Sequence, residues 1–394
     1  MTVILFDDQF RNNLLPLTYT RPVSEIRVGI LTIAEKWAFY FKTNPYYLTE
    51  DYLREKYPFG TGESNILING SVCPNEELVE AIEKLNEGEG LVAGSILIAL
   101  KLSETEAKQF IIDRTDRYNT KNFKGSIVKI SFPEDIFSNN DQEIRMDFNI
   151  LTKGRSSISL SSTNTVIGDN IFVEEGAVAE CATFNTTQGP IYLGRDSQVW
   201  EGTHIRGSFA LCEGSIVKMG AKIYGMTTIG PHSKAGGEIN NSVIFGNSAK
   251  GHEGYLGNSV VGEWCNIGAD TNNSNMKNNY AEVRLWDYQK ENFRRTGLQF
   301  CGLIMGDHSK CGINAMFNTG TVVGVSANIF GAGFPRNFVP DFAWGGSQGF
   351  ETYSLVKMFE TAERVYERKK EVFGETDKKI LTKVFELSDK YRRF

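Results

Sequence analysis

The chain has 394 residues, 41% hydrophobic and 23% charged, so it is long enough for two or more packed domains and is not composed like a disordered protein. Its net charge of −6, without a run of like charges, argues against a general nucleic-acid or anionic-membrane binder. The start, MTVILFDDQF, resembles neither a signal peptide nor a membrane span, and the six scattered cysteines form no CxxC pair. We therefore expect a cytoplasmic protein with reduced, buried thiols.

Residues 1–150 alternate apolar runs with helical patterns. Four apolar runs predict buried strands, at 3–6, 46–49, 65–70 and 90–100. Two helical patterns lie between them, TIAEKWAFYF (32–41) and NEELVEAIEKL (75–85). This alternation predicts an α/β domain with a mainly parallel sheet. Ligands of such sheets bind beyond the carboxyl ends of the strands, which here are Phe6–Asp8 and the loop after Asn69–Gly70.

The following part of the chain repeats every six residues. Aliphatic residues stand in register at Leu193, Val199, Ile205, Leu211, Val217, Ile223 and Ile229, and a later run comprises Met305, Cys311, Phe317, Val323 and Ile329. Neither a helix nor simple alternation gives a strict period of six. Three hexads can instead close one triangular coil of about 18 residues, with the aliphatic residues stacked inside. The hexads predict a left-handed parallel β-helix from near Ser159 to near Asn337.

Two segments leave this register, at 236–251 and at 278–300, and the second has the composition of an external loop or hairpin. After the β-helix, residues 354–373 and 377–394 show helical spacing and are rich in Lys and Glu, which predicts two amphipathic helices. We therefore expect three parts: an α/β domain at 1–155, a left-handed β-helix at 156–345, and C-terminal helices at 346–394.

One of only four histidines, His252, lies in the glycine-rich stretch SAKGHEGYLGNSVVGEWCNIGAD. A base that accepts a proton near neutral pH is most often a histidine. The neighbouring glycines would let a substrate approach the backbone. The alternative is a turn histidine bonded to a nearby carbonyl. A zinc site of the β-helical carbonic anhydrase type needs two histidines five residues apart, and the sequence has no such pair.

The same stretch resembles the family of bifunctional N-acetylglucosamine-1-phosphate uridylyltransferase/glucosamine-1-phosphate N-acetyltransferases, which carries KxxHxxYLGDxxIGxxxNIGAGTxxxN. The resemblance implies that His252 is the catalytic base, that Tyr255 and Asn266 contact the amino sugar, and that Asn275 lies near the acetyl thioester. Lys218, in KMGA, would replace the family's phosphate-binding arginine. EINN (238–241) stands where the family has a glutamate-x-lysine, and the insertion at 278–300 has no counterpart.

The front domain is similar to the nucleotidyltransferase half of that family. LLPLTYTRPVSEIRVGILTIAEKW (14–37) matches its LLPLTxxRPKPL stretch, although DDQFRNN replaces the glycine-rich GxGTR loop and Val23 replaces a lysine. Ser71 stands where the family has a metal-binding aspartate, so substitute carboxylates would come from Asp7, Asp8 or Asp147. The resemblance implies a nucleotide site with Mg²⁺, and we expect it to be formed by Arg11, Arg21, Arg27, Lys36 and Gly70.

These features together predict an acetyl-CoA-dependent N-acetyltransferase acting on an amino-sugar-1-phosphate, fused to an active or vestigial nucleotidyltransferase that uses UTP or dTTP. Arg294 and Arg295, on the insertion, would reach the 3′-phosphate of coenzyme A, unless they belong to a solvated hairpin. The resemblance further implies a homotrimer. Two alternatives remain: a nucleotidyltransferase with the β-helix as a trimerisation scaffold, and a non-catalytic sugar-nucleotide sensor.

Overall fold

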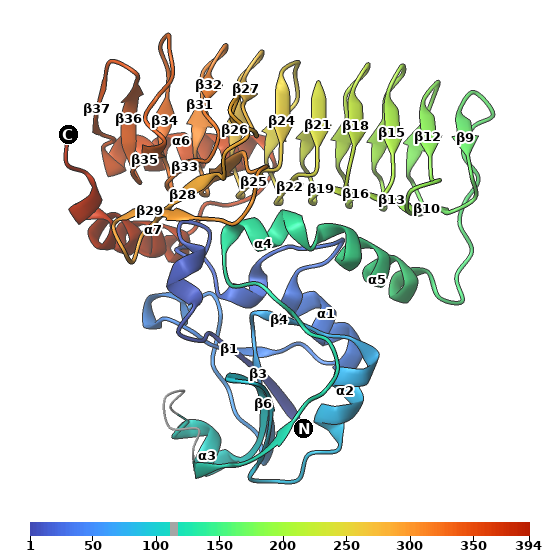
Figure 1. Cartoon of the computed structure of the whole chain (residues 1–394), viewed down its shortest axis with the longest axis vertical. Helices are drawn as coiled ribbons and strands as arrows, with labels where there is room; N and C mark the ends of the chain where they lie inside the picture. The colour runs from blue at the N-terminus through green and yellow to red at the C-terminus, as the bar shows by residue number, and fades with distance from the viewer. Residues whose placement is uncertain (111–116) are drawn as a thin grey trace. The chain divides into compact units, whose positions relative to one another are not determined.

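The computed structural model describes residues 1–110 and 117–394, which form two compact units (Figure 1). The first unit comprises Met1–Leu14, Thr20–Ile26 and Leu31–Phe132, and the second comprises Leu15–Tyr19, Arg27–Ile30 and Pro133–Phe394. The chain therefore passes into the second unit twice before residue 31 and returns each time. Residues 133–155, which we assigned to the α/β domain, pack with the β-helix instead.

The first unit is built on a mixed sheet. Within the described residues its strands follow the order β2-β1-β3-β6-β5-β7, with these bounds: β1 Thr2–Phe6, β2 Tyr46–Leu48, β3 Ser64–Asn69, β5 Glu89–Ala93, β6 Ile96–Ser103 and β7 Asn119–Asn122. β1 pairs in parallel with β2 and β3, but β6 is antiparallel to both β3 and β5. The run 90–100, predicted as one strand, turns back at Gly94 (φ 58°) and forms two. The prediction of a single strand there was wrong.

Helices and a short second sheet complete this unit. α1 (Ile33–Phe41) begins with a capping box, in which the Thr32 hydroxyl accepts from the Glu35 amide and the Glu35 carboxylate accepts from the Thr32 amide. α2 (Glu76–Glu83) has a simpler cap, in which the Asn75 side chain accepts from the Leu78 amide. The remaining elements are η1 (Arg11–Leu14), η2 (Val23–Glu25), η3 (Asp51–Leu53), α3 (Glu104–Lys108) and the antiparallel pair β4 (Val72–Cys73) and β8 (Val128–Lys129).

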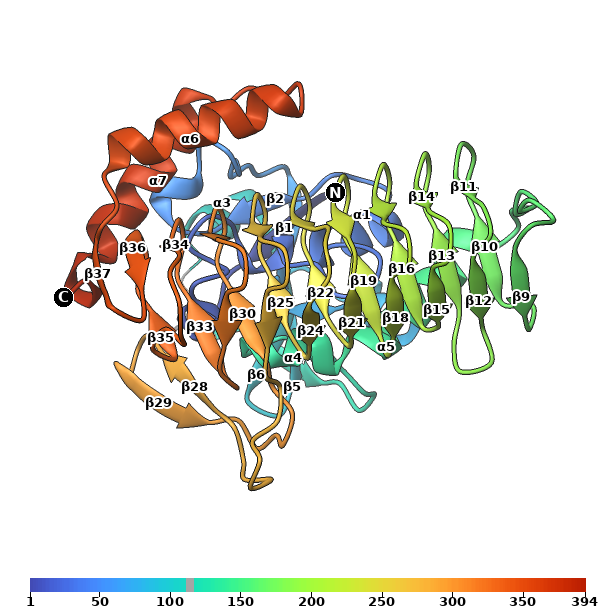
Figure 2. The same cartoon turned by 90° about the horizontal axis from the view of Figure 1, so that it is seen from above.

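The second unit is a three-sided parallel β-helix, with its strands stacked in rows (Figures 1 and 2). Sheet one contains β10 (Ile171–Val173), β13 (Ile191–Leu193), β16 (Phe209–Leu211), β19 (Thr227–Ile229), β22 (Val243–Ile244), β25 (Val260–Val261), β30 (Leu303–Met305), β33 (Thr321–Val323) and β35 (Phe338–Val339). Sheet two contains β11 (Val178–Ala179), β14 (Gln198–Val199), β17 (Ile216–Val217), β20 (Lys234–Ala235), β23 (Ala249–Lys250), β26 (Asn266–Ile267), β31 (Lys310–Cys311), β34 (Asn328–Ile329), β36 (Ala343–Gly346) and β37 (Gly349–Thr352). Sheet three contains β9 (Thr165–Ile167), β12 (Thr183–Asn185), β15 (His204–Arg206), β18 (Lys222–Tyr224), β21 (Glu238–Asn240) and β24 (Tyr255–Gly257), followed by the pair β27 (Asn272–Asn273) and β32 (Met316–Phe317).

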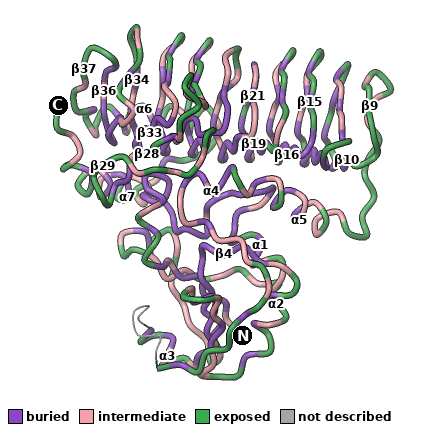
Figure 3. Tube along the Cα trace, viewed as in Figure 1, coloured by how far each residue is buried: buried purple, intermediate pink, exposed green. Residues whose placement is uncertain are grey.

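The predicted hexad residues form the buried interior of this β-helix (Figure 3). Leu193, Leu211 and Ile229 occupy successive coils of one sheet, eighteen residues apart, and each pairs directly with the next. Such side chains stack at the spacing of neighbouring strands, about 4.8 Å, and form one continuous apolar core. The fold class predicted from the sequence, an α/β domain followed by a left-handed β-helix and C-terminal helices, is confirmed.

The two segments that break the hexad register differ in structure. Residues 236–251 stay within the β-helix, but their coil is shorter, since Ile229 pairs with Ile244, fifteen residues on. Residues 278–300 leave it and form the antiparallel hairpin of β28 (Arg284–Asp287) and β29 (Asn292–Arg295), as predicted (Figure 2). The C-terminal segments form α6 (Leu355–Arg368) and α7 (Glu375–Leu387), followed by η5 (Asp389–Tyr391). Of the six cysteines, five are buried, but Cys181 is exposed, contrary to expectation.

Residues 27–30 form a strap that is bound from two sides within the second unit. α4 (Pro133–Ser138) and α5 (Asn140–Thr152) lie against the β-helix. Asn140 Oδ1 accepts from the Gly29 amide (2.8 Å), and Asp147 Oδ2 accepts from the Ile30 amide (2.8 Å). On the other side, Thr228 Oγ1 of β19 donates to the Gly29 carbonyl (2.9 Å). The strap therefore joins α5 to the β-helix through buried backbone hydrogen bonds.

This geometry predicts that Gly29→Ala destabilises the protein more than Gly220→Ala. Both glycines have positive φ (82° and 72°), so alanine costs each site about 1–2 kcal/mol of backbone strain. At Gly29 the added Cβ would also lie 2.4 Å from Asp147 Oδ2 and 2.8 Å from the Glu143 carbonyl, whereas nothing lies within 4 Å at Gly220. Thermal denaturation of the two variants measures the difference, which we expect to be about 1–3 kcal/mol. Equal losses would show that the strap relaxes freely.

Within the described residues, the structure contains no helix that is both long and apolar enough to cross a membrane.

Candidate functional site

His252 lies on a corner of the β-helix, between β23 and β24, and its side chain is exposed. Corresponding corners between sheets two and three contain four residues, for example 218–221, 268–271 and 312–315. The corner one coil before His252 contains only Gly236 and Gly237, so the interior residues Ala235 and Ile239 are four residues apart instead of six. The His252 turn therefore lies beside a corner that is two residues shorter than its neighbours.

The glycines at this corner serve close packing of the backbone. A Cβ on Gly237 would lie 2.8 Å from the carbonyl oxygens of His252 and Gly254, and a Cβ on Gly254 would lie 2.1 Å from the Thr271 oxygen. Gly254 also has a φ of 113°, which side chains rarely adopt. These glycines let neighbouring coils touch, rather than leaving the open space for substrate that we expected. Gly251 differs, because a Cβ there would meet nothing closer than 3.8 Å.

Tyr255 and Asn275, two predicted site residues, are brought together. Asn275 Nδ2 donates to Tyr255 Oη (2.9 Å) and to Asn258 Oδ1 (2.8 Å). Partial burial raises the pKa of Tyr255, so its phenol is neutral at physiological pH and can donate its own proton to a ligand. The arrangement is a polar platform on the face that follows the His252 corner.

Side chains of neighbouring asparagines hold this platform in place. Asn272 Oδ1 accepts from the Tyr255 amide (2.8 Å), and Asn273 Oδ1 accepts from the Gly257 amide (2.9 Å). Asn273 Nδ2 also donates to the Gly257 carbonyl (3.1 Å). Two side chains thus supply hydrogen bonds that a neighbouring strand backbone supplies elsewhere.

Asn266 and Lys218 lie elsewhere on the β-helix. Asn266 is exposed on β26 in sheet two, whereas Tyr255 belongs to sheet three. The Lys218 ammonium stands 3.4 Å from the centroid of the Trp200 ring, and burial, followed by the charge of Lys234, lowers the pKa of Lys218. Its cation–π contact leaves Lys218 as a cation at the corner that follows β17.

The two hairpin arginines differ in what surrounds them. The Arg294 guanidinium forms a buried, two-pronged ion pair with the Glu134 carboxylate of α4. This pair fastens the hairpin to α4, and a phosphate would have to compete with Glu134 for the guanidinium, which disfavours the expected role of Arg294 in coenzyme A binding. Arg295 is exposed, 3.7 Å from Glu282.

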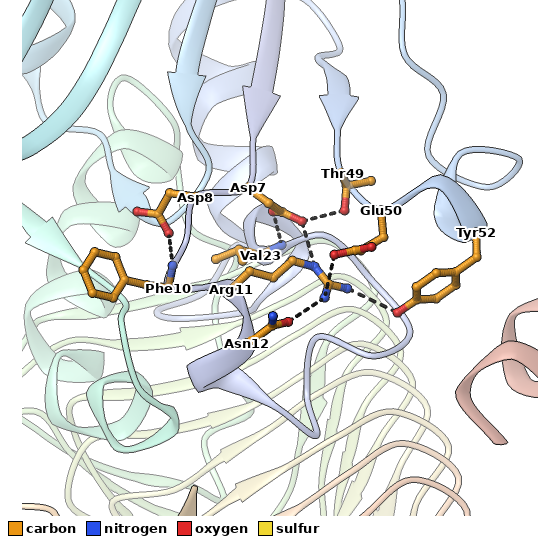
Figure 4. Close-up of polar contacts among 9 residues, drawn as sticks. All are labelled: Asp7, Asp8, Phe10, Arg11, Asn12, Val23, Thr49, Glu50 and Tyr52. Atoms are coloured by element: carbon orange, nitrogen blue, oxygen red, sulfur yellow. Dashed lines mark hydrogen bonds and ion pairs between the residues drawn. The ribbon is translucent and has the colours of Figure 1, made fainter. Parts of the chain in front are cut away.

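In the first unit, charged residues gather at the carboxyl ends of β1 and β2 (Figure 4). The Asp7 carboxylate, in a side chain that is 7% exposed, accepts from Arg11 Nε (3.0 Å), from Thr49 Oγ1 (2.5 Å) and from the Val23 amide (2.8 Å). Burial raises the pKa of Asp7, although its partners oppose the rise. Arg11 also lies 3.7 Å from Glu50, so this predicted phosphate ligand is held by two carboxylates.

A second cluster in this unit includes a lysine that the sequence did not reveal. Lys129 Nζ lies 3.0 Å from Asp8 Oδ2 and 4.6 Å from the centroid of the Phe10 ring. Asn69 donates to the same carboxylate oxygen (3.0 Å), and Ser71 Oγ donates to Asn69 Oδ1 (2.6 Å). Ser71 is thus bonded within the protein, at the position where the resembled family has a metal-binding carboxylate. Lys129 follows no recognisable motif, which is why sequence reasoning missed it.

The remaining predicted nucleotide ligands are spread over both units. Arg21 and Lys36 are buried in the first unit, whereas Arg27 belongs to the second and donates to the Ile30 carbonyl. The Gly70 amide donates to the Phe6 carbonyl (2.8 Å), which ties the β1 and β3 loops together. Asp147, a candidate carboxylate, also belongs to the second unit and binds the strap. In the parts of the chain that the structure describes, no three His, Cys, Asp or Glu side chains are grouped to hold a metal ion.

The chain is similar to known sugar nucleotidyl transferases and to bifunctional relatives. Residues 3–156 match the model of the family described as sugar nucleotidyl transferase. The bifunctional protein GlmU of Methanocaldococcus jannaschii is 34% identical over 87 residues, which is 22% of this chain and 21% of that protein. A bifunctional sugar-1-phosphate nucleotidylyltransferase/acetyltransferase of Sulfurisphaera tokodaii is 26% identical over 145 residues, 36% of each chain. The matches thus span about a fifth to a third of these relatives' lengths.

Among solved structures, the polySia-specific acetyltransferase NeuO is 14% identical with a TM-score of 0.24, and the match covers 49% of this chain and 87% of that one. This likeness is too distant to carry an argument. The family match of residues 3–156 and the two bifunctional relatives confirm the resemblance inferred from the motifs: this chain resembles bifunctional GlmU-type proteins, and its front part matches the sugar nucleotidyl transferase family.

Proposed function

We propose that this chain is an acetyl-CoA-dependent N-acetyltransferase that acts on an amino-sugar-1-phosphate in the cytoplasm. The observation that carries the proposal is the exposed His252 on its turn, followed along the chain by the Tyr255–Asn275 platform. Tyr255 and Asn266 would contact the sugar, and Asn275 would lie near the acetyl thioester. Lys218 would attract the sugar phosphate.

His252 would act as the base in the acetyl transfer. The ring nitrogen takes a proton from the substrate ammonium, and the freed amine attacks the thioester carbonyl. A C–N bond forms and the C–S bond breaks, so that coenzyme A leaves as the thiol and one proton passes to solvent. Polar groups facing the carbonyl oxygen would stabilise its negative charge as it develops.

We also propose that the first unit binds a sugar-1-phosphate and UTP or dTTP, with Mg²⁺ if it is active. Its match to the sugar nucleotidyl transferase family supports this proposal. A nucleotidyltransferase that uses the β-helix only as a scaffold, and a non-catalytic sensor, are the competing proposals. Thiol release from acetyl-CoA and pyrophosphate release from UTP or dTTP, measured across several amino-sugar phosphates, separate the three.

His252→Ala should lower the rate of acetyl transfer by roughly 10²–10⁴-fold, because a positioned base is lost. Glu201→Ala is the matched control, since Glu201 is exposed at the same position of an earlier corner. Thiol release with acetyl-CoA and glucosamine-1-phosphate measures both variants. Because His252 and Glu201 are exposed and lie outside the interior, both variants should have the melting temperature of the wild type. Equal rates for His252→Ala and wild type would leave His252 as an ordinary turn residue.

Pyrophosphate release by the first unit should be slow compared with typical enzyme turnover of about 1–10³ s⁻¹. Ser71 supplies a hydroxyl already bonded to Asn69, and Arg11 is neutralised by Asp7 and Glu50. The assay combines UTP or dTTP with a sugar-1-phosphate and Mg²⁺, and omits Mg²⁺ in a parallel sample. Magnesium-dependent release at ordinary rates would mean that other carboxylates, such as Asp7 or Asp8, hold the metal.

The proposal includes a homotrimer, in which the acyltransferase site lies between adjacent β-helices as in the resembled family. Sedimentation at micromolar concentration should therefore give three times the mass of the chain, 44.1 kDa. A monomer under these conditions would eliminate the shared site.

A further inference from the structure

Lys250 occupies a position that belongs to the interior of the β-helix. Along sheet two it pairs with Ala235, which in turn pairs with Val217. The next residue in the same row is Ile267, which pairs with Cys311. All of these neighbours are apolar or thiols, whereas Lys250 carries an amine, yet only 2% of its surface is exposed. Burying an ammonium in such surroundings is costly unless it is fully hydrogen-bonded.

The Lys250 ammonium bonds to the turn that carries His252. Its Nζ donates to the His252 carbonyl (2.5 Å) and to the Glu253 carbonyl (3.2 Å). These two residues are exposed at the surface, while their carbonyls point back to the buried amine. Lys250 thus connects the interior of the prism to the backbone of the His252 turn.

The backbone hydrogen bonds explain why this turn needs the amine. At regular corners the third residue donates to the second residue of the preceding corner: the Gly220 amide donates to the Glu201 carbonyl, and the Asn314 amide to the Ala269 carbonyl (2.8 Å). His252 is the second residue of its corner, but the Asp270 amide donates to Glu253 instead (3.0 Å). The backbone hydrogen bond has shifted by one residue, from the His252 carbonyl to the Glu253 carbonyl. Lys250 Nζ donates to the His252 carbonyl in place of the backbone amide.

We propose that Lys250 is a positioning residue, whose buried ammonium fixes the carbonyls of the His252 turn and so holds the His252 ring toward its substrate. This inference rests on the proposed acetyl transfer at His252. A displacement of about 1 Å at a reacting group can cost roughly 100-fold in rate, so a tether at this point has a kinetic consequence.

The tether should weaken with rising pH. Burial lowers the pKa of Lys250 to about 8, and the nearby Glu253, Cys311 and Asp270 partly oppose this. Above pH 8 the amine becomes neutral and its bonds to the two carbonyls lose their charge-assisted strength. The folded pKa lies below the ordinary value of 10.5, so folding disfavours the protonated form. Protein stability should therefore rise, relative to a variant without the amine, between pH 8 and 10.5, while the tether weakens.

The kinetic test compares Lys250→Met with Lys222→Met. Methionine fills the interior without charge. Lys222 is an exposed lysine of β18 whose ammonium lies 3.7 Å from the Glu253 carboxylate, so both variants remove one positive charge near the His252 turn. At pH 7 we expect Lys250→Met to lower kcat roughly 10- to 100-fold, and Lys222→Met to change it less than about twofold, because surface ion pairs contribute little. The ratio of wild-type to Lys250→Met kcat should approach one by pH 9.5, and in the His252→Ala background Lys250→Met should have no further effect.

A second measurement does not depend on activity. Amide hydrogen exchange at residues 251–254, corrected for the intrinsic effect of pH, should be faster in Lys250→Met than in wild type at pH 7, and unchanged in Lys222→Met. In the wild type alone, protection should fall as the pH passes 8. If no acetyl transfer is found, the proposed function fails while exchange still tests the tether. Unchanged protection in Lys250→Met, or unchanged kcat in an active enzyme, would overturn the positioning role. A lower melting temperature of Lys250→Met than of wild type at pH 7 would also overturn the positioning role, since Lys250 would then be an ordinary stabilising residue.

Discussion

The structure depends on one constraint, the stacking of successive coils in parallel register. Each interior residue must lie directly above its counterpart one coil earlier, so any change in the number of residues at a corner must be absorbed at that corner. The coil from Ile229 to Ile244 is three residues shorter than the coil before it, which runs from Leu211 to Ile229. Two of these are lost at Gly236–Gly237, directly before the His252 turn. The shortened corner and its glycines therefore decide how the backbone of that turn is presented.

The same constraint explains where polar groups enter the prism. An interior position favours an aliphatic side chain, which gains from burial and needs no hydrogen bond. Lys250 and Asn273 depart from this on either side of the His252–Tyr255 segment, and both are hydrogen-bonded to backbone groups that a regular coil would have satisfied. Replacing such groups by apolar ones is often neutral or stabilising elsewhere. Lys250 and Asn273 instead orient the backbone of the candidate site, although apolar side chains at these positions would make the interior more stable.

Much of the β-helix was predictable because its signal is local and periodic. The period of six can be read directly from the hexads of 193–229 and 305–329, without information on distant contacts. The hairpin at 278–300 was predicted because that period is lost there. Tyr255 and Asn275 were predicted from motif spacing, and they are in contact. Lys250 was not predicted, because Ala235 and Ile239 are only four residues apart, and the six-residue count that would place Lys250 inside is interrupted there. The ion pair of Arg294 was not predicted because its partner, Glu134, lies 160 residues away, and nothing local indicates that pairing.

The two units illustrate different uses of buried charge. In the first, carboxylates and cations pair with each other: Asp7 with Arg11, and Asp8 with Lys129. Paired charges hold loops at the carboxyl edge of a sheet, but each cation must leave a carboxylate before it can bind a phosphate, and this competition costs affinity. In the second unit the Lys250 ammonium pairs with neutral carbonyls and carries its bond directly to the turn of a candidate base. Because the ammonium donates to carbonyl dipoles, it stabilises one backbone conformation of the turn, and the loss of a single proton weakens those bonds.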